Sequence, residues 1–310
     1  MESFDISYFT PRHNMPNKEI PISSELAQDE HDISQLPFNN VTWVSSHNSA
    51  ANDYAAGDNV LLQMATNQKY SVYTQLKTLG VRGLMIDLEY KQDTLQLVHG
   101  LLSFGTFKDL INYEIIPFLE EDRDAIITID IETLGDRAAI MRELRLILGN
   151  TPALTSRIFR ITDERWDNHK EWPTIQEVRD ADQRVLILSD STIVSSNDLG
   201  INFRWNLVLE NHWLGGLDSC SNRIEGFEHL DIPWHYRTIF PRPWSRLFTM
   251  NHFCCGSGVE SLPRVQPDNI GGGDNGWGIL YPRTKLCQEA NGYDRKPNFI
   301  AIDWSHLGVY

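Results

Sequence analysis

Short runs of apolar residues recur along the chain from about residue 40 onward, and they are nearly continuous in Val, Ile and Leu instead of alternating with polar residues. Continuous apolar runs of this length are typical of strands buried on both faces, as in a parallel sheet covered by helices. The strands expected on this basis are 41–47, 81–88, 94–99, 125–132, 184–190, 205–211, 246–253 and 298–304, with 156–162 as a further candidate.

Between several of these runs the apolar positions change to helical spacing, which predicts helices over 71–79, 107–121 and 136–150. In the last of these, Ile140, Leu144 and Ile147 fall on one face, and Gly149 followed by Asn150 provides a stop signal. About eight strands with intervening helices predict an α/β fold of the irregular (β/α)8 TIM-barrel type. The runs at 81–88 and 94–99 are too close for a helix between them, so a hairpin-like connection is expected there.

The domain organisation follows from where this pattern begins. Residues 1–40 have no clear periodicity and contain Pro11, Pro16, Pro21 and Pro37, so they are expected to form an irregular lead-in. Residues 41–310 are expected to form a single barrel domain, since a chain of this length buries a sizeable core without division.

Composition excludes some classes of partner. The formal net charge of −15 argues against a nucleic-acid-binding protein and against electrostatic attachment to anionic lipid, both of which require a basic surface. No apolar run approaches the roughly 18 residues of a membrane span, so at most a peripheral membrane contact is expected. The N-terminal sequence shows neither a basic start nor an apolar stretch typical of a secretory signal.

The four cysteines all lie in the last third of the chain, within sequence rich in Gly, Asn and Asp. An even number in loop-like sequence favours disulfides, and with them a secreted or extracytoplasmic location, over the alternative of free thiols in a reducing compartment. Their spacing fits no zinc motif, and it leaves the pairing open. The cysteines are Cys220, Cys254, Cys255 and Cys287.

Candidate chemistry begins with two histidines, His47 and His99, each at the end of an apolar run. Histidine is the side chain that can take up and release a proton near neutral pH, so the pair indicates acid–base catalysis. A lone histidine at a strand end is also commonly a hydrogen-bonded structural residue. What strengthens the catalytic interpretation is that acidic residues end the neighbouring strands.

Those acidic residues are spaced as oxygen ligands for a cation. Alternation along a strand places Asp87 and Glu89 on one face of theirs, and Asp130 and Glu132 on one face of theirs. With the amide of Asn48, these carboxylates suit Ca²⁺ or Mg²⁺, whereas zinc would require cysteine or closely spaced histidines. Each carboxylate alone could equally be a salt-bridged or capping residue.

The order of these elements resembles the catalytic X-region of phosphatidylinositol-specific phospholipase C, within the wider group of barrel-shaped phosphodiesterases. The similarity extends over about residues 40 to 305, and its more specific part is the succession of HN, an acidic strand and HG. It is carried by SSHNS at 45–49, GVRGLMIDLEY at 80–90, LVHG at 97–100, IITIDIE at 126–132, WPTIQEVRDADQRVLILSD at 172–190 and WNLVLEN at 205–211. SCSNR at 219–223, LFTMNHF at 247–253 and KPNFIAIDW at 296–304 are similar to the more distant members.

The resemblance implies cleavage of phosphatidylinositol by its own 2-hydroxyl, giving diacylglycerol and a cyclic inositol phosphate. It implies that His47 deprotonates this hydroxyl or stabilises the transition state, and that His99 protonates the departing oxygen. It also implies that Asn48, Asp87 and Glu132 bind calcium, because the bacterial enzymes have an arginine at the position of Asp87 instead of a metal.

The chain departs from this pattern in two places. Met85 stands where the calcium-type enzymes have a glutamate, so either Glu89, on the same strand face, compensates as a further ligand or the cation site is weak. Ser189 and Asp190 end their strand without the lysines that hold ring phosphates, so unphosphorylated phosphatidylinositol or a glycosylated derivative is the expected substrate. Arg82 fits the family's GVR, with a role in orienting a strand or a carboxylate.

Residues outside the core motif have weaker roles. Loop-like Trp213, Trp234 and Trp244 are candidates for seating in a membrane interface, although core packing explains them equally well. Among the polar residues near later strand ends, Asp303 is the best candidate for orienting a histidine. The others, which are not expected to be catalytic, are Asn251, His252 and His306.

Two alternatives to the phosphatidylinositol-cleaving enzyme stay open. One is a related barrel phosphodiesterase acting on glycerophosphodiesters or sphingomyelin, whose relatives carry Glu-x-Asp where this chain has Met-x-Asp. The other is a barrel that has lost catalysis and binds lipid headgroups or a protein. The sequence leaves the oligomeric state open.

Overall fold

The chain divides into two compact units, Met1–Asp32 and Ile33–Tyr310, and the description that follows concerns the second. The computed structural model describes residues 32–211, 220, 242, 244–253, 277–290 and 296–307.

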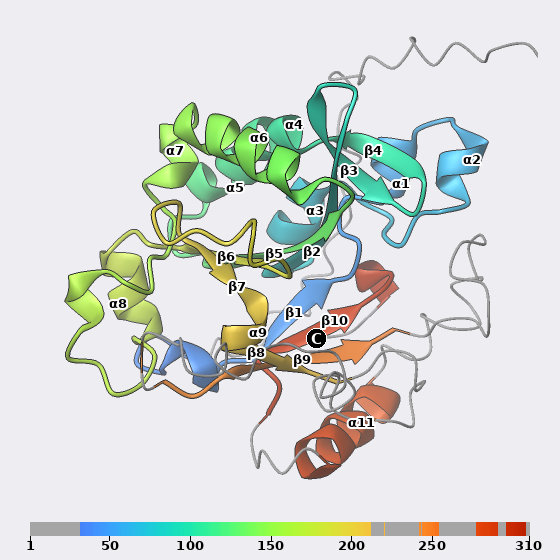
Figure 1. Cartoon of the computed structure of the whole chain (residues 1–310). Coiled ribbons are helices and arrows are strands. Elements are labelled where there is room, and N and C mark those ends of the chain that lie inside the picture. The colour runs from blue at the N-terminus through green and yellow to red at the C-terminus, as the bar shows by residue number, and fades with distance from the viewer. Residues whose placement is uncertain are drawn as a thin grey trace, which may run out of the picture. The chain divides into compact units, whose positions relative to one another are not determined.

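Eight parallel strands form a barrel-like sheet (Figure 1). In sheet order they are β7 (Ile201–Phe203), β6 (Val185–Ser189), β5 (Ile127–Leu134), β2 (Gly83–Lys91), β1 (Trp43–Ser46), β10 (Phe299–Ile302), β9 (Leu247–His252) and β8 (Val208–Glu210). All seven pairings between neighbours in this order are parallel. Within the described residues β7 and β8 are not paired, and the short helix α9 (Arg204–Leu207) joins them. The expected irregular α/β barrel is therefore confirmed, and its irregularity is this open seam.

Strand β2 is followed by a hairpin before the chain enters the helices that lead to the next barrel strand, β5. Strand β2 pairs antiparallel with β3 (Thr94–His99), which pairs antiparallel with β4 (Leu102–Thr106). The chain turns at Gln92 and Asp93, both with positive φ, which is the backbone of a tight two-residue hairpin turn. The expected hairpin is thus present, but the prediction that 94–99 is a barrel strand is wrong: it projects from the barrel with β4.

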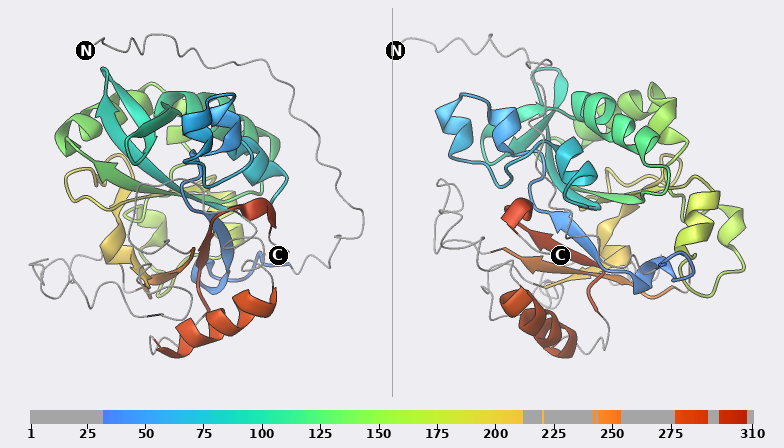
Figure 2. Two further views of the ribbon diagram at one scale, coloured as in Figure 1. Left: turned by 90° about the vertical axis from the view of Figure 1, so that its right-hand side faces the viewer. Right: turned by 180° about the vertical axis from the view of Figure 1, so that it is seen from behind.

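The expected helices at 71–79, 107–121 and 136–150 are present, and they cover the outside of the sheet (Figures 1 and 2). The middle one is a continuous helical segment with a single π turn, Ile111–Ile115, in its centre. The candidate strand at 156–162 contributes only an isolated bridge from Ile158 to Val185. The helices are α1 (Asp53–Ala56), α2 (Val60–Gln63), α3 (Val72–Lys77), α4 (Phe107–Leu110), α5 (Ile116–Glu121), α6 (Arg137–Gly149), α7 (Pro152–Thr155), α8 (Ile175–Asp180) and α11 (Trp277–Ala290), with 3-10 turns at Phe38–Asn40, Glu164–Trp166 and Ser305–Leu307.

A hydrophobic core lies between the sheet and the covering helices. Aliphatic side chains of β2, β5 and β6 pack against α3, α6 and the 107–121 helical segment. Burial of this apolar surface, at roughly 25 cal/mol per Å², is the main force that holds the strand ends in fixed positions.

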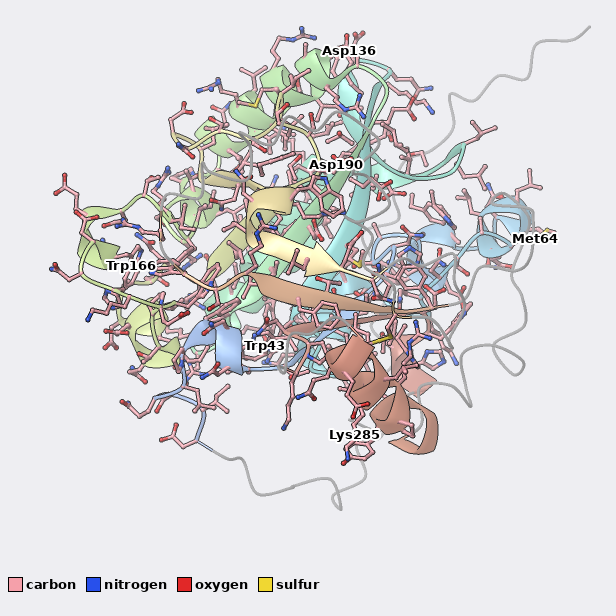
Figure 3. The ribbon with its side chains drawn as sticks, turned by 60° about the horizontal axis from the view of Figure 1, so that its bottom comes forward. Trp43, Met64, Asp136, Trp166, Asp190 and Lys285 are labelled. Carbon is pink, nitrogen blue, oxygen red and sulfur yellow. A yellow bond between two sulfur atoms is a disulfide. The ribbon has the colours of Figure 1, made fainter. Side chains whose placement is uncertain are left out.

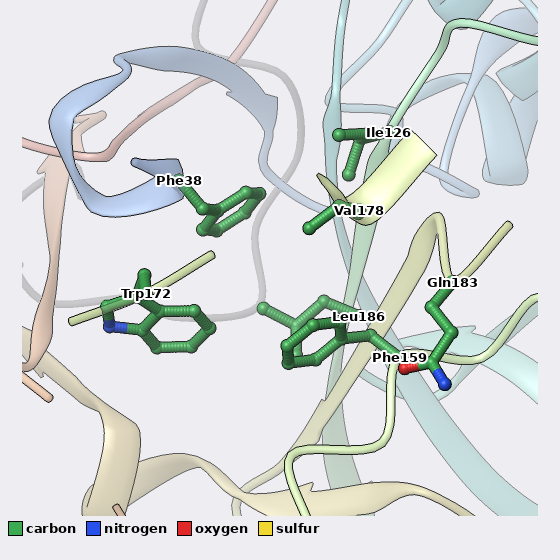
Figure 4. A pocket seen from close by; sticks show the side chains of 7 residues that line it. All are labelled: Phe38, Ile126, Phe159, Trp172, Val178, Gln183 and Leu186. Carbon is green, nitrogen blue, oxygen red and sulfur yellow. The ribbon is translucent and has the colours of Figure 1, made fainter. Parts of the chain in front are cut away.

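An aromatic cluster closes the end of the barrel where the parallel strands begin. Phe38, Phe159, Trp172 and Trp244 are all buried there, with ring centroids 5.1–6.5 Å apart in the contacting pairs. A small apolar pocket lies beside it (Figure 4), lined by Phe38, Ile126, Phe159, Trp172, Val178, Gln183 and Leu186. Trp244 is therefore a core residue and not an interfacial one, and its indole Nε1 donates to the carbonyl of His169. Trp213 and Trp234 lie outside the described residues.

Cys220 and Cys287 form a disulfide that links α11 to a residue 67 positions earlier. Both cysteines are buried beside Met250 of β9 and Ile302 of β10. Cys254 and Cys255 lie outside the described residues. Within the part of the chain that the structure describes, none of the helices is both long and apolar enough to cross a membrane.

Candidate active site

Polar and charged residues gather at the end of the barrel where the parallel strands finish, opposite the aromatic cluster. Because neighbouring parallel strands finish at the same edge, residues far apart in the sequence meet there. Each barrel strand contributes at or just after its carboxyl end: His47 after β1, Asp87 on β2, Glu132 on β5, Asp190 after β6, Arg204 after β7, Glu210 on β8, His252 on β9 and Asp303 after β10.

The imidazole of His47 is held at its edge by a carboxylate. Its Nδ1 lies 2.9 Å from Oδ1 of Asp303, and the amide of Asn67 donates to the same oxygen at 3.1 Å. The amide of Gln68 donates to the backbone carbonyls of His47 and Ile302, which ties the ends of β1 and β10 together. The sequence-based expectation that Asp303 orients a histidine therefore agrees with the contact in the structure.

The face of the same imidazole is covered as well. The ring of Phe253 stacks on it with centroids 3.7 Å apart and planes at 3°. Phe253 follows β9 directly and is buried. Hydrophobic periodicity could not single out this phenylalanine, because it looks like one more core residue of the run at 246–253.

The charges around His47 favour its protonated form. Burial lowers the pKa of this imidazole, but the Asp303 carboxylate, with smaller contributions from Asp87 and Glu132, raises it more strongly. The net result is a pKa raised above the ordinary value for histidine.

Asp87 and Glu132 lie side by side at this mouth, because β2 and β5 pair in the register that puts them opposite one another. Burial and the neighbouring Glu132 raise the pKa of Asp87 to about 7, although His47 and Arg204 act in the opposite direction. Two adjacent carboxylates repel one another, so a positive charge beside them is stabilised.

Arg204 is the central cation of the mouth, and sequence analysis missed it. Its side chain is fully buried at the barrel's open seam, and its Nε donates to Oδ1 of Asp130 at 2.7 Å. Burial acts against its charge, but Asp130, Glu210 and further carboxylates raise its pKa. Asp130, whose own pKa burial raises to about 6, is thereby committed to an ion pair and is not free to bind a metal.

His99 joins this site from the hairpin. Its Nδ1 lies 2.8 Å from the carbonyl oxygen of Ala65, which fixes the tautomer with a proton on Nδ1 and leaves Nε2 for chemistry. Burial lowers the pKa of His99, and the charge of His47 lowers it further. The two histidines are therefore electrostatically coupled, with pKa values displaced in opposite directions.

The expected cation ligands are not all equivalent. Asn48 is buried and takes a left-handed backbone conformation, φ 46°, at the first turn after β1, and its amide donates to Asn67 at 3.2 Å. Glu89 forms an ion pair with Lys91 at 2.6 Å, one step further along β2 than Asp87. Met85 brings no donor suited to a hard cation. Among the described residues, no three His, Cys, Asp or Glu side chains are gathered as a ready-made metal site.

The oxygen donors nonetheless fit a hard divalent cation. Asp87 and Glu132 supply paired carboxylates, and Asn48 supplies an amide of the kind that Ca²⁺ and Mg²⁺ accept. Burial, with Glu132 beside it, raises the pKa of Asp87, and a cation bound at this pair would lower it.

Other polar residues near the mouth have structural partners. Asp190 accepts hydrogen bonds from the backbone and the hydroxyl of Thr133 on the neighbouring strand. Asn251 exchanges hydrogen bonds with Asn211 across β8 and β9. Arg82 donates to the carbonyls of Leu76 and Val81 and to the carboxylate of Asp122, away from the mouth at the beginning of β2, so its contacts fit both orienting roles expected for it.

Comparison with known proteins places this geometry in a class. The sequence model of the PI-PLC X family matches residues 34–213, which is more than half of the chain. The chain therefore belongs to the PI-PLC X family.

Individual relatives agree with this assignment. A PI-PLC X domain-containing protein of Arabidopsis thaliana is 28% identical over 284 residues, covering 88% of this chain and 59% of that protein. The chain thus spans about three fifths of the length of this curated relative. The phosphatidylinositol-specific phospholipase C of Listeria monocytogenes has a similar fold, with a TM-score of 0.55 at 13% identity, covering 88% of this chain and 92% of that one. A structure of the Staphylococcus aureus enzyme gives a TM-score of 0.53 at 11% identity, covering 86% and 87%.

Proposed function

We propose that the chain is a phosphodiesterase that cleaves phosphatidylinositol-type lipids into diacylglycerol and a cyclic inositol phosphate. The observation that carries the proposal is the coupled pair of histidines at the mouth, His47 held by Asp303 and His99 held by the Ala65 carbonyl. Two imidazoles whose pKa values are shifted in opposite directions can act together, one as the general base and the other as the general acid. Membership of the PI-PLC X family supports the choice of a phosphodiester.

In the proposed reaction the 2-hydroxyl of the inositol ring attacks phosphorus and loses its proton to Nε2 of His47. Asp303 holds Nδ1 of the same ring and stabilises the imidazolium that forms. The bond from phosphorus to the glycerol oxygen then breaks, and Nε2 of His99 gives its proton to that oxygen. Arg204 and the imidazolium of His47 are the nearby positive charges that oppose the negative charge developing on the phosphate.

The pKa values bear on which histidine plays which role. In the structure His47 has the higher pKa and His99 the lower one, so the dominant resting form carries its proton on His47. The assignment above therefore works from the minor protonation state, and the reverse assignment, with His99 as base and His47 as acid, uses the major one. A substrate with a good leaving group distinguishes the two, because its departing oxygen or sulfur needs no general acid.

A divalent cation belongs to the proposal, with Ca²⁺ preferred and Mg²⁺ as the alternative. Asp87, Glu132 and Asn48 would hold it, with Glu89 as an outer participant once released from Lys91. When bound, the cation supplies positive charge beside the phosphate. Its second effect would be to offset the two carboxylates that raise the pKa of His47.

The charge of the mouth favours an unphosphorylated headgroup. Asp87, Glu132, Asp130, Asp190 and Glu210 surround the site, and Arg204 is the buried cation that they act on. Additional phosphates on the inositol ring would meet this negative potential, whereas hydroxyl groups can donate to it. We therefore propose phosphatidylinositol or a glycosylated derivative as substrate. The disulfide between Cys220 and Cys287 supports an extracytoplasmic site of action.

The test is phosphorus NMR of the products from phosphatidylinositol vesicles, with Ca²⁺ and with excess chelator, using His47→Ala as the inactive control. A cyclic phosphate signal that requires both Ca²⁺ and His47 is the expected result. Cleavage to a linear monoester without a cyclic product would favour the related phosphodiesterases of glycerophosphodiesters or sphingomyelin. Absence of any product, with headgroup binding retained, would replace the enzyme with a lipid-binding barrel.

A further inference from the structure

One short segment of the chain, residues 65–68, is connected by hydrogen bonds to both candidate catalytic histidines. It lies between α2 and α3, beside the β3–β4 hairpin (Figures 1 and 2). We propose that Asn67, supported by the neighbouring Gln68, is a positioning residue that holds the imidazole of His47 in a fixed arrangement relative to that of His99. The inference rests on the proposed function, because it takes the two histidines to be the acid–base pair.

The two histidines come from strands that do not pair with one another. His47 follows β1, whereas His99 ends β3, which pairs with β2 and β4. The segment follows Met64, which lies on the outer side of the barrel (Figure 3). Its Ala65 carbonyl oxygen lies 2.8 Å from Nδ1 of His99, and two residues later the side chain of Asn67 donates to the carboxylate that holds His47. The separation of the two imidazoles therefore depends on positions within one short segment.

The side-chain amide of Asn67 has its orientation set by its two partners. An ionised carboxylate can only accept, so the group of Asn67 that lies 3.1 Å from Oδ1 of Asp303 is its NH₂ donor. On its other side, Oδ1 of Asn67 accepts from the amide of Asn48 at 3.2 Å. The same oxygen of Asp303 lies 2.9 Å from Nδ1 of His47, so Asn67 and His47 share one acceptor atom. The amide thereby limits rotation of the carboxylate, and through it rotation of the imidazole.

Gln68 holds the backbone on both sides of this contact. Its side chain is fully buried, and its Nε2 donates to the carbonyl oxygens of His47 and Ile302 at 2.9 and 3.0 Å. Its Oε1 accepts from the backbone N–H and from the hydroxyl of Ser305, at 3.0 and 2.9 Å. Both hydrogens and both lone pairs of the amide are thus used. All of these bonds go to His47 itself or to residues within two positions of Asp303.

The backbone directly after Asp303 adopts a conformation that requires such support. Trp304 has a φ of 52°, in the left-handed region that bulky residues rarely occupy. Its N–H donates to the backbone carbonyl of Asn67 at 2.8 Å, and the bonds from Ser305 to Gln68 follow at the next residue. Backbone in a sparsely populated conformation persists where the surrounding contacts over-determine it, and it is concentrated at functional sites. The turn is therefore a second observation that Asn67 and Gln68 fix the position of Asp303.

The experiment compares the full native chain with Asn67→Ala and with Thr66→Val as the matched control. The hydroxyl of Thr66 donates to Oδ1 of Asp53 at 2.7 Å, so the control also removes a side-chain hydrogen bond from this segment, but none that leads to a histidine. With a short-chain phosphatidylinositol below its aggregation concentration, Asn67→Ala should lower kcat about tenfold to a hundredfold and change KM by less than about twofold, because a misplaced proton-transfer group slows the chemical step without weakening substrate binding. Thr66→Val should retain the native kcat.

A second measurement follows the position of His47 without turnover. In protein with ¹⁵N-labelled histidine, the proton on Nδ1 of His47 is identified by its absence in His47→Gln. Its exchange with water should be about tenfold faster in Asn67→Ala, because the carboxylate that holds it is less well fixed. The exchange rate should be native in Thr66→Val.

The two measurements separate failure of this inference from failure of the proposed function. Lower kcat together with faster proton exchange, in Asn67→Ala alone, supports the positioning role. Faster exchange in Asn67→Ala when the native chain has no turnover supports the hold on His47 and counts against the enzyme. A native exchange rate in Asn67→Ala overturns the positioning role, as does an unchanged kcat in an active enzyme. Equal effects of Asn67→Ala and Thr66→Val also overturn it, because general loosening of the segment would then be the cause.

Discussion

His47 is held by contacts that constrain different freedoms of its ring. Asp303 fixes the edge through Nδ1, Phe253 covers one face, and the backbone of His47 is tied to β10 through Gln68. A parallel stack with rings 3.7 Å apart is a poor arrangement for two neutral rings, which prefer offset or edge-to-face packing. It becomes favourable when the imidazole is a cation, so the stack and Asp303 both favour the same protonated form.

The stack with Phe253 leads to a first prediction. Phe253→Leu should keep the volume but lose the aromatic face, lowering kcat by a few-fold to about tenfold with little change in KM. Phe253→Tyr keeps the aromatic face, so its kcat should be close to that of the native chain. The pH profile of kcat should shift to lower pH in the leucine variant, because the imidazolium of His47 loses a favourable contact. A leucine variant with an unmoved profile would show that Phe253 serves packing alone.

A second prediction separates the roles of the two histidines. If His99 is the general acid, His99→Ala should slow turnover of the natural alkoxide leaving group by about 10²- to 10⁴-fold, and it should slow a substrate with a phenolate or thiolate leaving group far less. His47→Ala should slow both substrates alike. In the opposite pattern, the good leaving group would rescue His47→Ala. His47 would then be the general acid and His99 the general base, which is the assignment that the order of their pKa values favours.

Asp87 gives a third prediction, about stability and pH. Its pKa is about 7 in the folded chain and near 4 when unfolded, so the folded state binds the extra proton between these values. The free energy of unfolding therefore falls as pH rises from about 4 to about 7. Asp87→Asn should abolish this loss and stabilise the metal-free chain at neutral pH, by a few kcal/mol at most, since one pKa unit is about 1.4 kcal/mol.

The measurement is thermal unfolding across pH with chelator and with Ca²⁺. Ca²⁺ should raise the melting temperature of the native chain at pH near 8 more than at pH near 5, because the carboxylate is already protonated at the lower value. The asparagine variant should respond weakly to Ca²⁺ at both. An equal response to Ca²⁺ in the native chain and the variant would remove Asp87 from the ligand set.

At the scale of elements, the sequence predicted what depends on local pattern and missed what depends on closure of the barrel. Continuous apolar runs located every barrel strand except the three-residue β7, which is too short to produce a pattern. The run at 205–211 predicted one strand, but its first part is the helical turn α9 at the open seam, and this turn places Arg204. No periodicity could reveal that an arginine beside that run is buried against Asp130, because the contact spans 74 residues.

The site residues also divide into those that local sequence pattern predicts and those that depend on tertiary packing. Strand-end positions brought His47, Asp87 and Glu132 into consideration, since the edge rule for parallel strands needs only the strand assignment. The partners that hold them, such as Asn67 and Phe253, come from loops whose course is set by tertiary packing. A signal for the hairpin was present, however, because the interval between 81–88 and 94–99 allowed no helix.

The fourth prediction concerns helix α11 and its disulfide. A crosslink between residues 67 positions apart restricts the unfolded chain and contributes about 4 kcal/mol in the chain-entropy model. Cys220→Ser/Cys287→Ser should therefore lower the free energy of unfolding by roughly that amount. Reduction with dithiothreitol should reproduce the effect in the native chain, but should leave the double variant unchanged. A matching loss in the reduced double variant would point to Cys254 and Cys255 instead.

At the scale of the whole molecule, the two ends of the barrel have different chemistry. One end is closed by aromatic side chains around Trp172 and Trp244, and the other gathers several carboxylates around Arg204. Stability and chemistry are thereby separated along the barrel axis, as is usual for folds of this type. The net charge of −15 adds to the acidic character of the second end, and it disfavours attraction of the molecule to an anionic surface.

This charge leads to the last prediction, on vesicle composition. At a fixed fraction of phosphatidylinositol, replacing phosphatidylcholine by phosphatidylserine should lower turnover at low ionic strength, because the acidic protein and the anionic surface repel one another. Raising the salt concentration should reduce the difference, since the Debye length falls from about 30 Å at 0.01 M to about 8 Å at 0.15 M. Turnover would be followed by release of water-soluble phosphate, with free Ca²⁺ buffered so that binding of the cation to phosphatidylserine does not change its activity. Faster turnover on the phosphatidylserine vesicles would mean that a basic surface of the protein faces the lipid.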